Sequence, residues 1–397
     1  MGALLLAPFY ILVNFYVARW LLRWMGTFHR HFKSWPVRAA LITLYVLLAS
    51  TLLTGFLITA NPLHRFLKTL GSFWLGSFLY ILLTTALFDL GRLILRHSRL
   101  VKQKHLDSRA VFLTAGSCAI VCIGLVSGYG ILHAGDIRVH HAELSVGKPC
   151  AVEKLDIALL ADFHLGYSVG AKQMSQMVEK VNRQNPDLIV IAGDIFDNEY
   201  DAVADPEKTA AVLSGLKSRY GTFACWGNHD VSERILAGFT FGGKETKPED
   251  PRFAQFLRSA GISLLQDESL LIDGAFYLTG RKDPSKAKKS GENRLSPGEL
   301  LQGLDMSKPV LVMDHQPKQL QELADAGADI DLSGHTHDGQ VFPGNLLLRL
   351  FWENPCGILK KGEMYSCVTS GIGVWGPAMR VGTDSEILML HLTFENH

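Results

Sequence analysis

The chain has 397 residues, of which 48% are hydrophobic and 19% are charged. Soluble domains carry roughly 25% charged residues, so this chain is poor in charge, and its apolar content excludes intrinsic disorder. The formal net charge of +1 is the sum of two halves of opposite charge. Residues 1–150 contain 15 Lys and Arg against 4 Asp and Glu, whereas the remainder contains 24 Lys and Arg against 34 Asp and Glu. The basic residues flank apolar runs rather than a globular segment, so no nucleic-acid partner is expected.

Four long apolar stretches occupy the first 135 residues. They lie at residues 1–18, 39–60, 69–88 and 110–135. A helix needs about 20 apolar residues to cross the hydrocarbon core of a bilayer, and each stretch meets or approaches that length. None shows the polar face of a helix that packs on a soluble core. We therefore predict a multi-pass transmembrane region of about four helices over residues 1–135.

The connections between these stretches predict the orientation in the membrane. The third connection is strongly basic, with Arg92, Arg96 and Arg99 among its residues, and the first is also rich in Arg and Lys. The second holds only Arg65 and Lys68. The positive-inside bias places the first and third connections in the cytoplasm. With four helices in an inner or plasma membrane, the globular half would then lie on the outer, periplasmic or extracellular face.

From residue 155 onward, short apolar runs alternate with amphipathic stretches, and residues 136–154 are expected to form a linker and a first edge strand. Strands are predicted at residues 155–161, 188–192, 222–226, 276–280, 310–313, 330–332, 365–369 and 387–392, and helices at 171–184 and about 205–218. This alternation indicates parallel strands joined by βαβ crossovers. The polar segments 242–250 and 283–293 are predicted as surface loops. The six cysteines show no zinc pattern, and one disulfide among the last four is open.

Polar clusters follow five of the predicted strands. They are Asp162-Phe163-His164, Gly193-Asp194-Ile195-Phe196-Asp197-Asn198, Gly227-Asn228-His229-Asp230, Asp314-His315-Gln316 and Gly334-His335-Thr336-His337. The carboxyl ends of strands line the ligand crevice of an open α/β sheet, so we expect all five clusters to meet at one edge.

The residue types in these clusters indicate metal chemistry. Carboxylates, imidazoles and one amide oxygen, without thiolates, suit Mn, Fe, Zn or Mg ions. Singly, Asp162 or Asp194 could be a helix N-cap and His315 a core histidine. Together, seven candidate ligands exceed the needs of one ion and suit two ions that share a carboxylate. Two ions roughly 3.5–4 Å apart can activate a hydroxide and clamp a phosphoryl group.

The chain resembles the calcineurin-like metallophosphoesterase superfamily over about residues 150–395. The resemblance rests on five motifs in this order: D-x-H, G-D-x-x-D, G-N-H-D, a lone His and G-H-x-H. The phrases Ser333-Gly334-His335-Thr336-His337 and His315-Gln316-Pro317 are similar to its YkuE-like and YaeI-like membrane-associated branch. The resemblance implies an α/β fold, namely a catalytic α/β/β/α sandwich over residues 155–397 behind the four-helix membrane region. It implies a first metal site formed by Asp162, His164, Asp194 and His337, and a second formed by Asp194, Asn228, His315 and His335.

The same resemblance implies roles for residues that do not bind metal. His229 would be the catalytic histidine, which stabilises phosphoryl charge or protonates the leaving oxygen. Asp230 would orient His229, and Asp197 would support a metal ligand. Arg380 would act as a bidentate clamp on the phosphate. Asp338 departs from the pattern, because a glycine is common after the final histidine.

The sequence therefore predicts a membrane-anchored phosphoesterase that hydrolyses a phosphodiester, phosphomonoester or pyrophosphate bond by metal-activated hydroxide, with a lipid-linked substrate as one hypothesis. Its cofactors would be two divalent ions, Mn²⁺ first, with Fe, Zn or Mg as alternatives. Two other readings stay open. One is a cytoplasmic-facing pyrophosphatase for a UDP-sugar lipid, and the other is a non-catalytic membrane scaffold or receptor with a structural metal site. His229 argues against the scaffold, because metal binding does not need it.

Overall fold

The structure is a computed structural model that describes the chain except residues 1, 60, 99–100, 237–238, 242–249 and 396–397. It divides into two compact units. The first, here called the helical unit, consists of Met1–Leu132, Ile235–Phe241 and Gly376–Met379. The second, here called the sheet unit, consists of His133–Arg234, Gly242–Trp375 and Arg380–His397.

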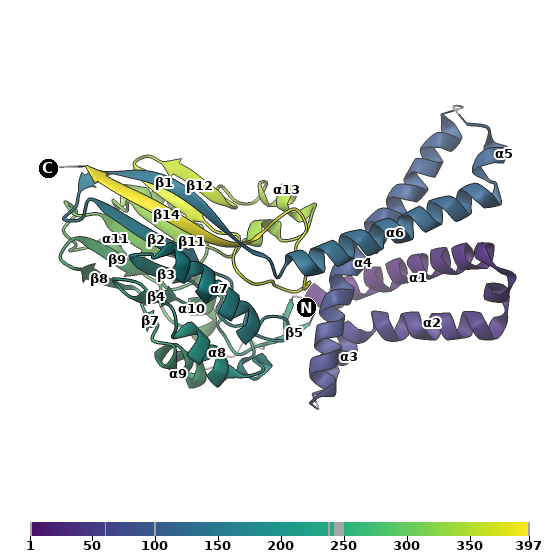
Figure 1. Cartoon of the computed structure of the whole chain (residues 1–397), viewed down its shortest axis with the longest axis horizontal. Coiled ribbons are helices and arrows are strands. Elements are labelled where there is room, and N and C mark those ends of the chain that lie inside the picture. Colours follow the sequence, from purple (N-terminus) through teal and green to yellow (C-terminus); the bar gives the residue numbers. More distant parts are fainter. Residues whose placement is uncertain (1, 60, 99–100, 237–238, 242–249, 396–397) are drawn as a thin grey trace. The chain divides into compact units, whose positions relative to one another are not determined.

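The helical unit consists mainly of helices, several of them long (Figure 1). They are α1 (Gly2–Phe28), η1 (Arg30–Lys33), α2 (Trp35–Ala49), α3 (Thr51–Leu57), α4 (Leu63–His97), α5 (Gln103–Leu106) and α6 (Arg109–His133). A buried cluster with Val17, Trp74 and Phe78 joins α1 and α4. Within it, the Trp74 indole nitrogen donates to the Tyr10 hydroxyl at 2.8 Å, and that hydroxyl donates to the Ala49 carbonyl at 2.8 Å. These bonds satisfy polar groups that lie between apolar helices.

Two helices among the described residues, α4 and α6, are long and apolar enough to cross a membrane. The pair α2 and α3, bent by 53° at its break, makes a third span if it is counted as one. The prediction of membrane spans is therefore supported for two or three of the four apolar stretches, and four spans are not confirmed. The break at Ser50 differs from the single span expected of the second stretch, which is uncharged throughout.

Two six-stranded sheets form the sheet unit. The first has the order β1-β14-β2-β3-β4-β7, with strands β1 (Ile137–Pro149), β2 (Lys154–Leu160), β3 (Leu188–Ala192), β4 (Thr222–Cys225), β7 (Ser263–Leu264) and β14 (Ser385–Glu395). The second has the order β12-β13-β11-β10-β9-β8, with strands β8 (Glu268–Ile272), β9 (Phe276–Gly280), β10 (Val310–Met313), β11 (Ile330–Ser333), β12 (Gly357–Lys361) and β13 (Met364–Val368). A separate pair, which belongs to the helical unit except for Arg234, consists of β5 (Arg234–Leu236) and β6 (Phe239–Phe241).

The central strands pair in parallel, as their alternation with helices predicts, whereas β14 is antiparallel to β2 and β12 is antiparallel to β13. The helices of the sheet unit are α7 (Ala171–Gln184), η2 (Tyr200–Ala202), α8 (Pro206–Leu213), α9 (Pro251–Ser259), α10 (Pro284–Ser290), α11 (Pro297–Leu301), α12 (Leu320–Asp325), η3 (His337–Gly339) and α13 (Gly344–Leu348).

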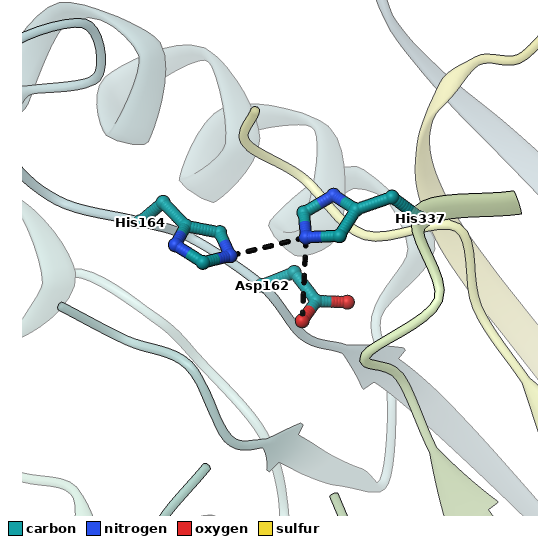
Figure 2. Close-up of side chains that lie close together, drawn as sticks. All are labelled: Asp162, His164 and His337. Carbon is teal, nitrogen blue, oxygen red and sulfur yellow. Dashed lines mark hydrogen bonds and ion pairs between the residues drawn. The ribbon is translucent and has the colours of Figure 1, made fainter. Parts of the chain in front are cut away.

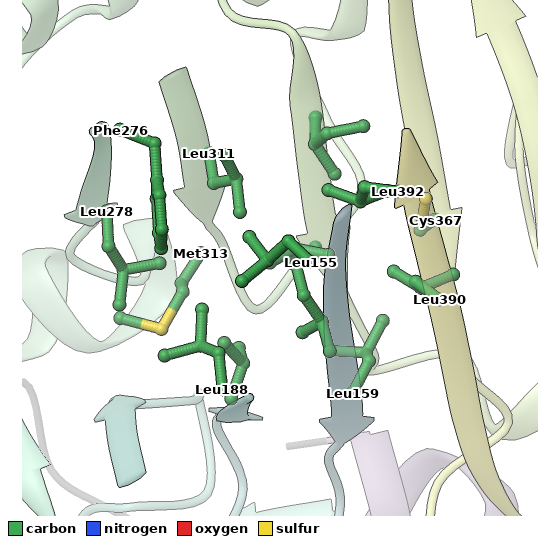
Figure 3. Packing of buried hydrophobic residues seen from close by; sticks show 14 of the residues in the cluster. Leu155, Leu159, Leu188, Phe276, Leu278, Leu311, Met313, Cys367, Leu390 and Leu392 are labelled. Carbon is green, nitrogen blue, oxygen red and sulfur yellow. The ribbon is translucent and has the colours of Figure 1, made fainter. Parts of the chain in front are cut away.

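The main core lies between the two sheets (Figure 3). Leu155 and Leu159 of β2 and Leu188 of β3 belong to the same buried cluster as Phe276 of β9 and Met313 of β10. All five side chains are fully buried. The strands are nearly continuous apolar runs because both of their faces are covered.

Helices cover the outer faces of the sheets. On α7, Met174, Met177, Val178 and Val181 are buried, which is the i, i+3, i+4, i+7 spacing of a single helix face. A second cluster joins residues of α11, α12 and the outer side of β10, including Val312. The sheet unit is thus a mixed α/β structure with its two sheets packed face to face.

One of the two segments predicted as surface loops contains a helix. Residues 283–293, predicted as a loop, contain α10, because the Asp283 carboxylate accepts the N–H groups of Ser285 and Lys286, and Pro284 occupies the first turn. The other predicted loop, 242–250, lies outside the described residues except for Asp250. All six cysteines are free, so the optional disulfide does not form.

Candidate active site

The candidate site is built on loops that leave the carboxyl ends of β2, β3, β4, β10 and β11. Backbone hydrogen bonds tie these loops to one another: the Asp162 N–H donates to the Gly193 carbonyl at 2.9 Å, and the His164 N–H donates to the Asp194 carbonyl at 3.0 Å. The Gly334 N–H likewise donates to His315 at 3.1 Å. The five clusters therefore reach a common place from strands far apart in the sequence.

Asp162, His164 and His337 form a first buried group of possible metal ligands (Figure 2). The Nε2 atoms of the two histidines lie 3.0 Å apart, and Nε2 of His337 lies 3.8 Å from Oδ1 of Asp162. The backbone N–H of His335 donates to both oxygens of Asp162, at 3.1 and 2.9 Å. This bond holds the carboxylate while its remaining lone pairs stay free for a cation.

Asp194, His315 and His335 form a second group, which Asn228 completes. Nε2 of His315 lies 3.1 Å from three atoms, namely Oδ2 of Asp194, Oδ1 of Asn228 and Nδ1 of His335. Nδ1 of His315 donates to the Ala192 carbonyl at 2.8 Å. That bond places the proton on Nδ1, so the Nε2 lone pair faces the group, as metal-binding histidines require.

Asp194 lies between the two groups. Its Oδ2 is 3.7 Å from Nε2 of His164 in the first group and 3.1 Å from Nε2 of His315 in the second. Burial alone would raise the pKa of Asp194, but the neighbouring His315 and His229 lower it well below its usual range. A buried, ionised carboxylate that lies between ring nitrogens of the two groups fits a bridging ligand. The residues present thus fit two divalent cations held by nitrogen and oxygen atoms.

Strained backbone is concentrated in these loops. Asp162, His164, Asp194, His335 and His337 all have positive φ angles, between 46° and 74°. Such conformations cost a non-glycine residue about 1–2 kcal/mol each and persist only where the surrounding structure holds them. Five of the seven candidate ligands have this conformation. This indicates that the surrounding structure holds the backbone under strain and thereby orients these side chains.

His229 lies at the edge of the site and is half-buried. Its ring meets the ring of His164 edge-on at a centroid distance of 5.1 Å, and its Nδ1 hydrogen-bonds Oδ1 of Asn198. Burial lowers the pKa of His229 to about 4. The ring is therefore neutral near pH 7 with its proton on Nδ1, and the negative charge of a phosphate would favour a second proton on Nε2.

Asp230 does not contact the His229 ring. Its fully buried carboxylate accepts the backbone N–H of Phe196 at 2.8 Å and that of Gly227 at 2.7 Å. The expectation that Asp230 orients His229 is thus wrong, because Asn198 occupies that position. The sequence places Asn198 in the polar cluster after the second strand, directly behind the G-D-x-x-D motif, but does not predict its contact with His229. Asp230 instead joins the loops after β3 and β4.

Arg380 is fully buried and does not present a clamp to a phosphate. Its guanidinium donates to four backbone carbonyls, those of His337 at 3.3 Å, Ser370 at 2.6 Å, Gly371 at 3.2 Å and Gly373 at 2.8 Å. The expected role of Arg380 as a clamp on the phosphate is therefore corrected: its guanidinium binds the backbone of the loop after β13. Burying a guanidinium leaves it no alternative to protein acceptors, and the carbonyls of this loop supply them.

Two acidic residues near the site have separate surroundings. Oδ1 of Asp197 lies 3.5 Å from Nδ1 of His164, the ring nitrogen opposite the one that faces His337. Asp338 is half-buried beside the candidate ligand His337, and burial raises its pKa to about 6. Behind His315, the buried Asp314 pairs with Arg281 at 3.0 Å, a contact that no sequence motif indicated.

Comparison with known families agrees with this geometry. Residues 155–339 match the calcineurin-like phosphoesterase family. An uncharacterized metallophosphoesterase of Aquifex aeolicus is 30% identical over 271 residues, which cover 67% of this chain and 95% of that protein. The chain therefore belongs to the calcineurin-like metallophosphoesterase family, whose members are metal-dependent phosphoesterases.

Two further relatives differ in how much of the chain they match. A transmembrane protein with metallophosphoesterase domain from Danio rerio is 29% identical over 89% of this chain and 79% of its own length. Phosphodiesterase YaeI of Escherichia coli is 28% identical over 72% of this chain and 99% of its own length. The chain covers only 60–63% of the length of the Helicobacter pylori and Campylobacter jejuni relatives that it matches.

Proposed function

We propose that the chain is a membrane-anchored phosphodiesterase that uses two divalent cations. The position of Asp194 carries the proposal, because one of its oxygens faces a ligand nitrogen from each group, at 3.1 and 3.7 Å. The name of the relative YaeI favours a phosphodiester over a phosphomonoester or pyrophosphate. The nitrogen and oxygen donor set is compatible with Mn²⁺, which we propose as the native ion.

The bound cations would supply Lewis-acid activation of water and stabilise charge on the phosphoryl oxygens. Asp162, His164 and His337 would hold one cation, and Asn228, His315 and His335 the other, with Asp194 shared. His229 would transfer a proton to the leaving oxygen through Nε2, while Asn198 fixes its tautomer through Nδ1. Asp230 would keep the loops of these residues together through Phe196 and Gly227.

The substrate is proposed to be lipid-linked. The support is that the helical unit contains two helices fit to span a membrane, or three with the bent pair, and a single span would suffice as an anchor. The basic connections between helices favour a catalytic domain on the outer face, as the positive-inside bias indicates. Cleavage of the catalytic domain by a protease added to intact spheroplasts would support this orientation. Protection of the domain from the protease would place it on the cytoplasmic face instead.

Turnover by the full-length protein in detergent tests the proposed activity. With Mn²⁺ present, we expect bis-p-nitrophenyl phosphate to be hydrolysed, chelator to abolish hydrolysis, and re-added Mn²⁺ to restore it. Asp194→Asn should lower the bound metal from two ions per chain to one or none. His229→Ala should retain both ions and lose about 10²–10⁴-fold in kcat.

His391→Ala is the matched control, because His391 lies on β14, bonds Asp156 and belongs to neither ligand group. It should behave like the wild type. Full activity in His229→Ala would overturn its assigned role, and absence of turnover with two bound ions would exclude an aryl diesterase. The lipid-linked substrate is tested by comparing kcat/KM for a lipid phosphodiester in vesicles with kcat/KM for its soluble headgroup analogue. If the lipid does not give the higher value, the hypothesis of a lipid-linked substrate is rejected.

A further inference from the structure

A basic cavity of about 560 Å³ lies at one end of the helical unit, where α1 ends and α6 begins. Six cationic side chains line it: Arg23, Arg30, Lys33, Arg38, Arg92 and Arg109. Among the described lining residues Asp107 is the one acid, and its carboxylate pairs with Arg92 at 2.7 Å. The cavity therefore carries a large excess of positive charge.

The cations have two kinds of surroundings. Arg109 donates to the Thr27 carbonyl at 3.0 Å, and Arg38 donates to the Phe32 carbonyl at 3.4 Å, so both fasten the walls of the cavity. Arg30 and Lys33 donate no side-chain hydrogen bond to any residue that the structure describes. Like charges held together without a counter-anion repel one another, and an anionic ligand would remove that cost.

An apolar groove continues from this cavity. It runs between α1 and α2, which lie side by side (Figure 1), and measures about 700 Å³. Ile11, Phe15 and Ala18 line it from α1, and Ile42 lines it from α2. Arg23 and Arg38 line both the groove and the basic cavity, so the two spaces adjoin.

We propose that the helical unit binds one anionic glycerophospholipid, with its phosphate in the basic cavity and an acyl chain in the α1–α2 groove. Guanidinium groups bind phosphate oxygens in a bidentate manner, and basic pockets between membrane helices suit lipid headgroups. An apolar groove that ends at clustered cations matches an acyl chain that ends at a phosphate. A free phosphate would use the cavity alone and leave the groove without a role. None of the candidate metal ligands contributes to this site.

Native mass spectrometry of the full-length protein in detergent tests the proposal. The probes are dioleoylphosphatidylglycerol, dioleoylphosphatidylcholine and glycerol phosphate. We expect phosphatidylglycerol to bind at least tenfold more tightly than phosphatidylcholine. The double variant Arg30→Gln and Lys33→Gln should lose about tenfold or more of that affinity.

The matched control is Lys102→Gln with Lys104→Gln, which removes the same charge from the connection between α4 and α6 without touching the lining of either space. It should bind phosphatidylglycerol as the wild type does. Ala18→Trp keeps every cation and fills the groove, so it should weaken phosphatidylglycerol binding as well. Lipid-free thermal unfolding checks that each variant folds, and Arg23→Gln replaces the double variant if the latter does not.

Four results would overturn the proposal. Equal losses in the two double variants would show diffuse attraction of anions. Equal affinities for phosphatidylglycerol and phosphatidylcholine would show that the charge of the lipid does not contribute to binding. Wild-type lipid affinity in Ala18→Trp would show that the groove does not bind the acyl chain. Displacement of phosphatidylglycerol by an equal concentration of glycerol phosphate would make this a site for a free phosphate.

Discussion

Nδ1 of His229 donates a hydrogen bond to Oδ1 of Asn198, which is a neutral amide. A carboxylate partner would raise the pKa of the imidazole, whereas a neutral amide fixes the tautomer and leaves the charge of the ring to the substrate. Asn198 is itself fully buried and has a positive φ of 62°, so its position is imposed by the loop after β3. The side chain is thus placed to position the proposed catalytic histidine.

Asn198→Ala and Asn198→Asp test this positioning role. Removing the amide frees the His229 ring, so we expect kcat to fall roughly 10–100-fold with little change in KM and with both metal ions retained. Asn198→Asp places a negative charge beside the ring, which should raise the pKa of His229 and, because His229 acts as the proton donor, move the alkaline limb of the kcat–pH profile to higher pH. Unchanged kcat and an unchanged profile in both variants would show that Asn198 only fills space.

Gly227 should not tolerate a side chain. A Cβ at this position would lie 2.1 Å from Oδ1 of Asp194 and 2.4 Å from its backbone nitrogen. Gly227→Ala must therefore displace the proposed bridging carboxylate, and we expect loss of bound metal together with loss of turnover. Gly298→Ala in α11 is the control, because a Cβ there meets no atom within 4 Å. Metal analysis showing two ions per chain in Gly227→Ala would contradict the assigned position of Asp194.

Arg380 should act on stability and loop order rather than on substrate affinity. Arg380→Gln leaves buried carbonyls of the loop after β13, including those of Ser370 and Gly373, without their donor. Each unsatisfied group costs about 1–3 kcal/mol, so we expect a marked fall in the thermal unfolding midpoint. KM of the surviving folded fraction should change less than threefold. A large rise in KM at unchanged stability would restore the phosphate clamp.

Asp331 should make stability depend on pH. Its oxygens contact the Ser333 hydroxyl at 3.0 Å and the Ser366 hydroxyl at 2.9 Å, and burial raises its pKa to about 7. The folded state therefore holds a proton that the unfolded state releases above a pKa of 3.8. Its contribution to stability is fully present below that value and is lost as the pH rises toward 7, by at most about 1.4 kcal/mol per pH unit.

Asp331→Asn mimics the protonated side chain and should remove this loss. Denaturant unfolding of the full chain at pH 5 and pH 8 measures it as the difference in free energy of unfolding between the two pH values. We expect a smaller difference in the variant than in the wild type. An identical difference in both proteins would mean that Asp331 is ionised in the folded state.

The sequence by itself determined the elements and the chemistry of the site. Apolar runs such as residues 188–192 mark buried strands, and polar residues directly after them mark strand ends, because both signals are local in the chain. Asp162, Asp194 and His315 follow such strands, and their types alone indicate a site for hard or borderline cations. Even α10, which was predicted as a loop, carries a local signal in its capping Asp283 and first-turn Pro284.

The tertiary structure decided what the side chains around the ligands contact. Asp230 and Arg380 share the polar character of the ligands, yet one binds backbone N–H groups and the other backbone carbonyls. A buried charge takes whichever partner the fold brings within about 3 Å, and that distance depends on loops far apart in the chain. For the same reason Asn198 came to hold His229, a contact between residues of two different strand-end loops that no spacing in the sequence could specify.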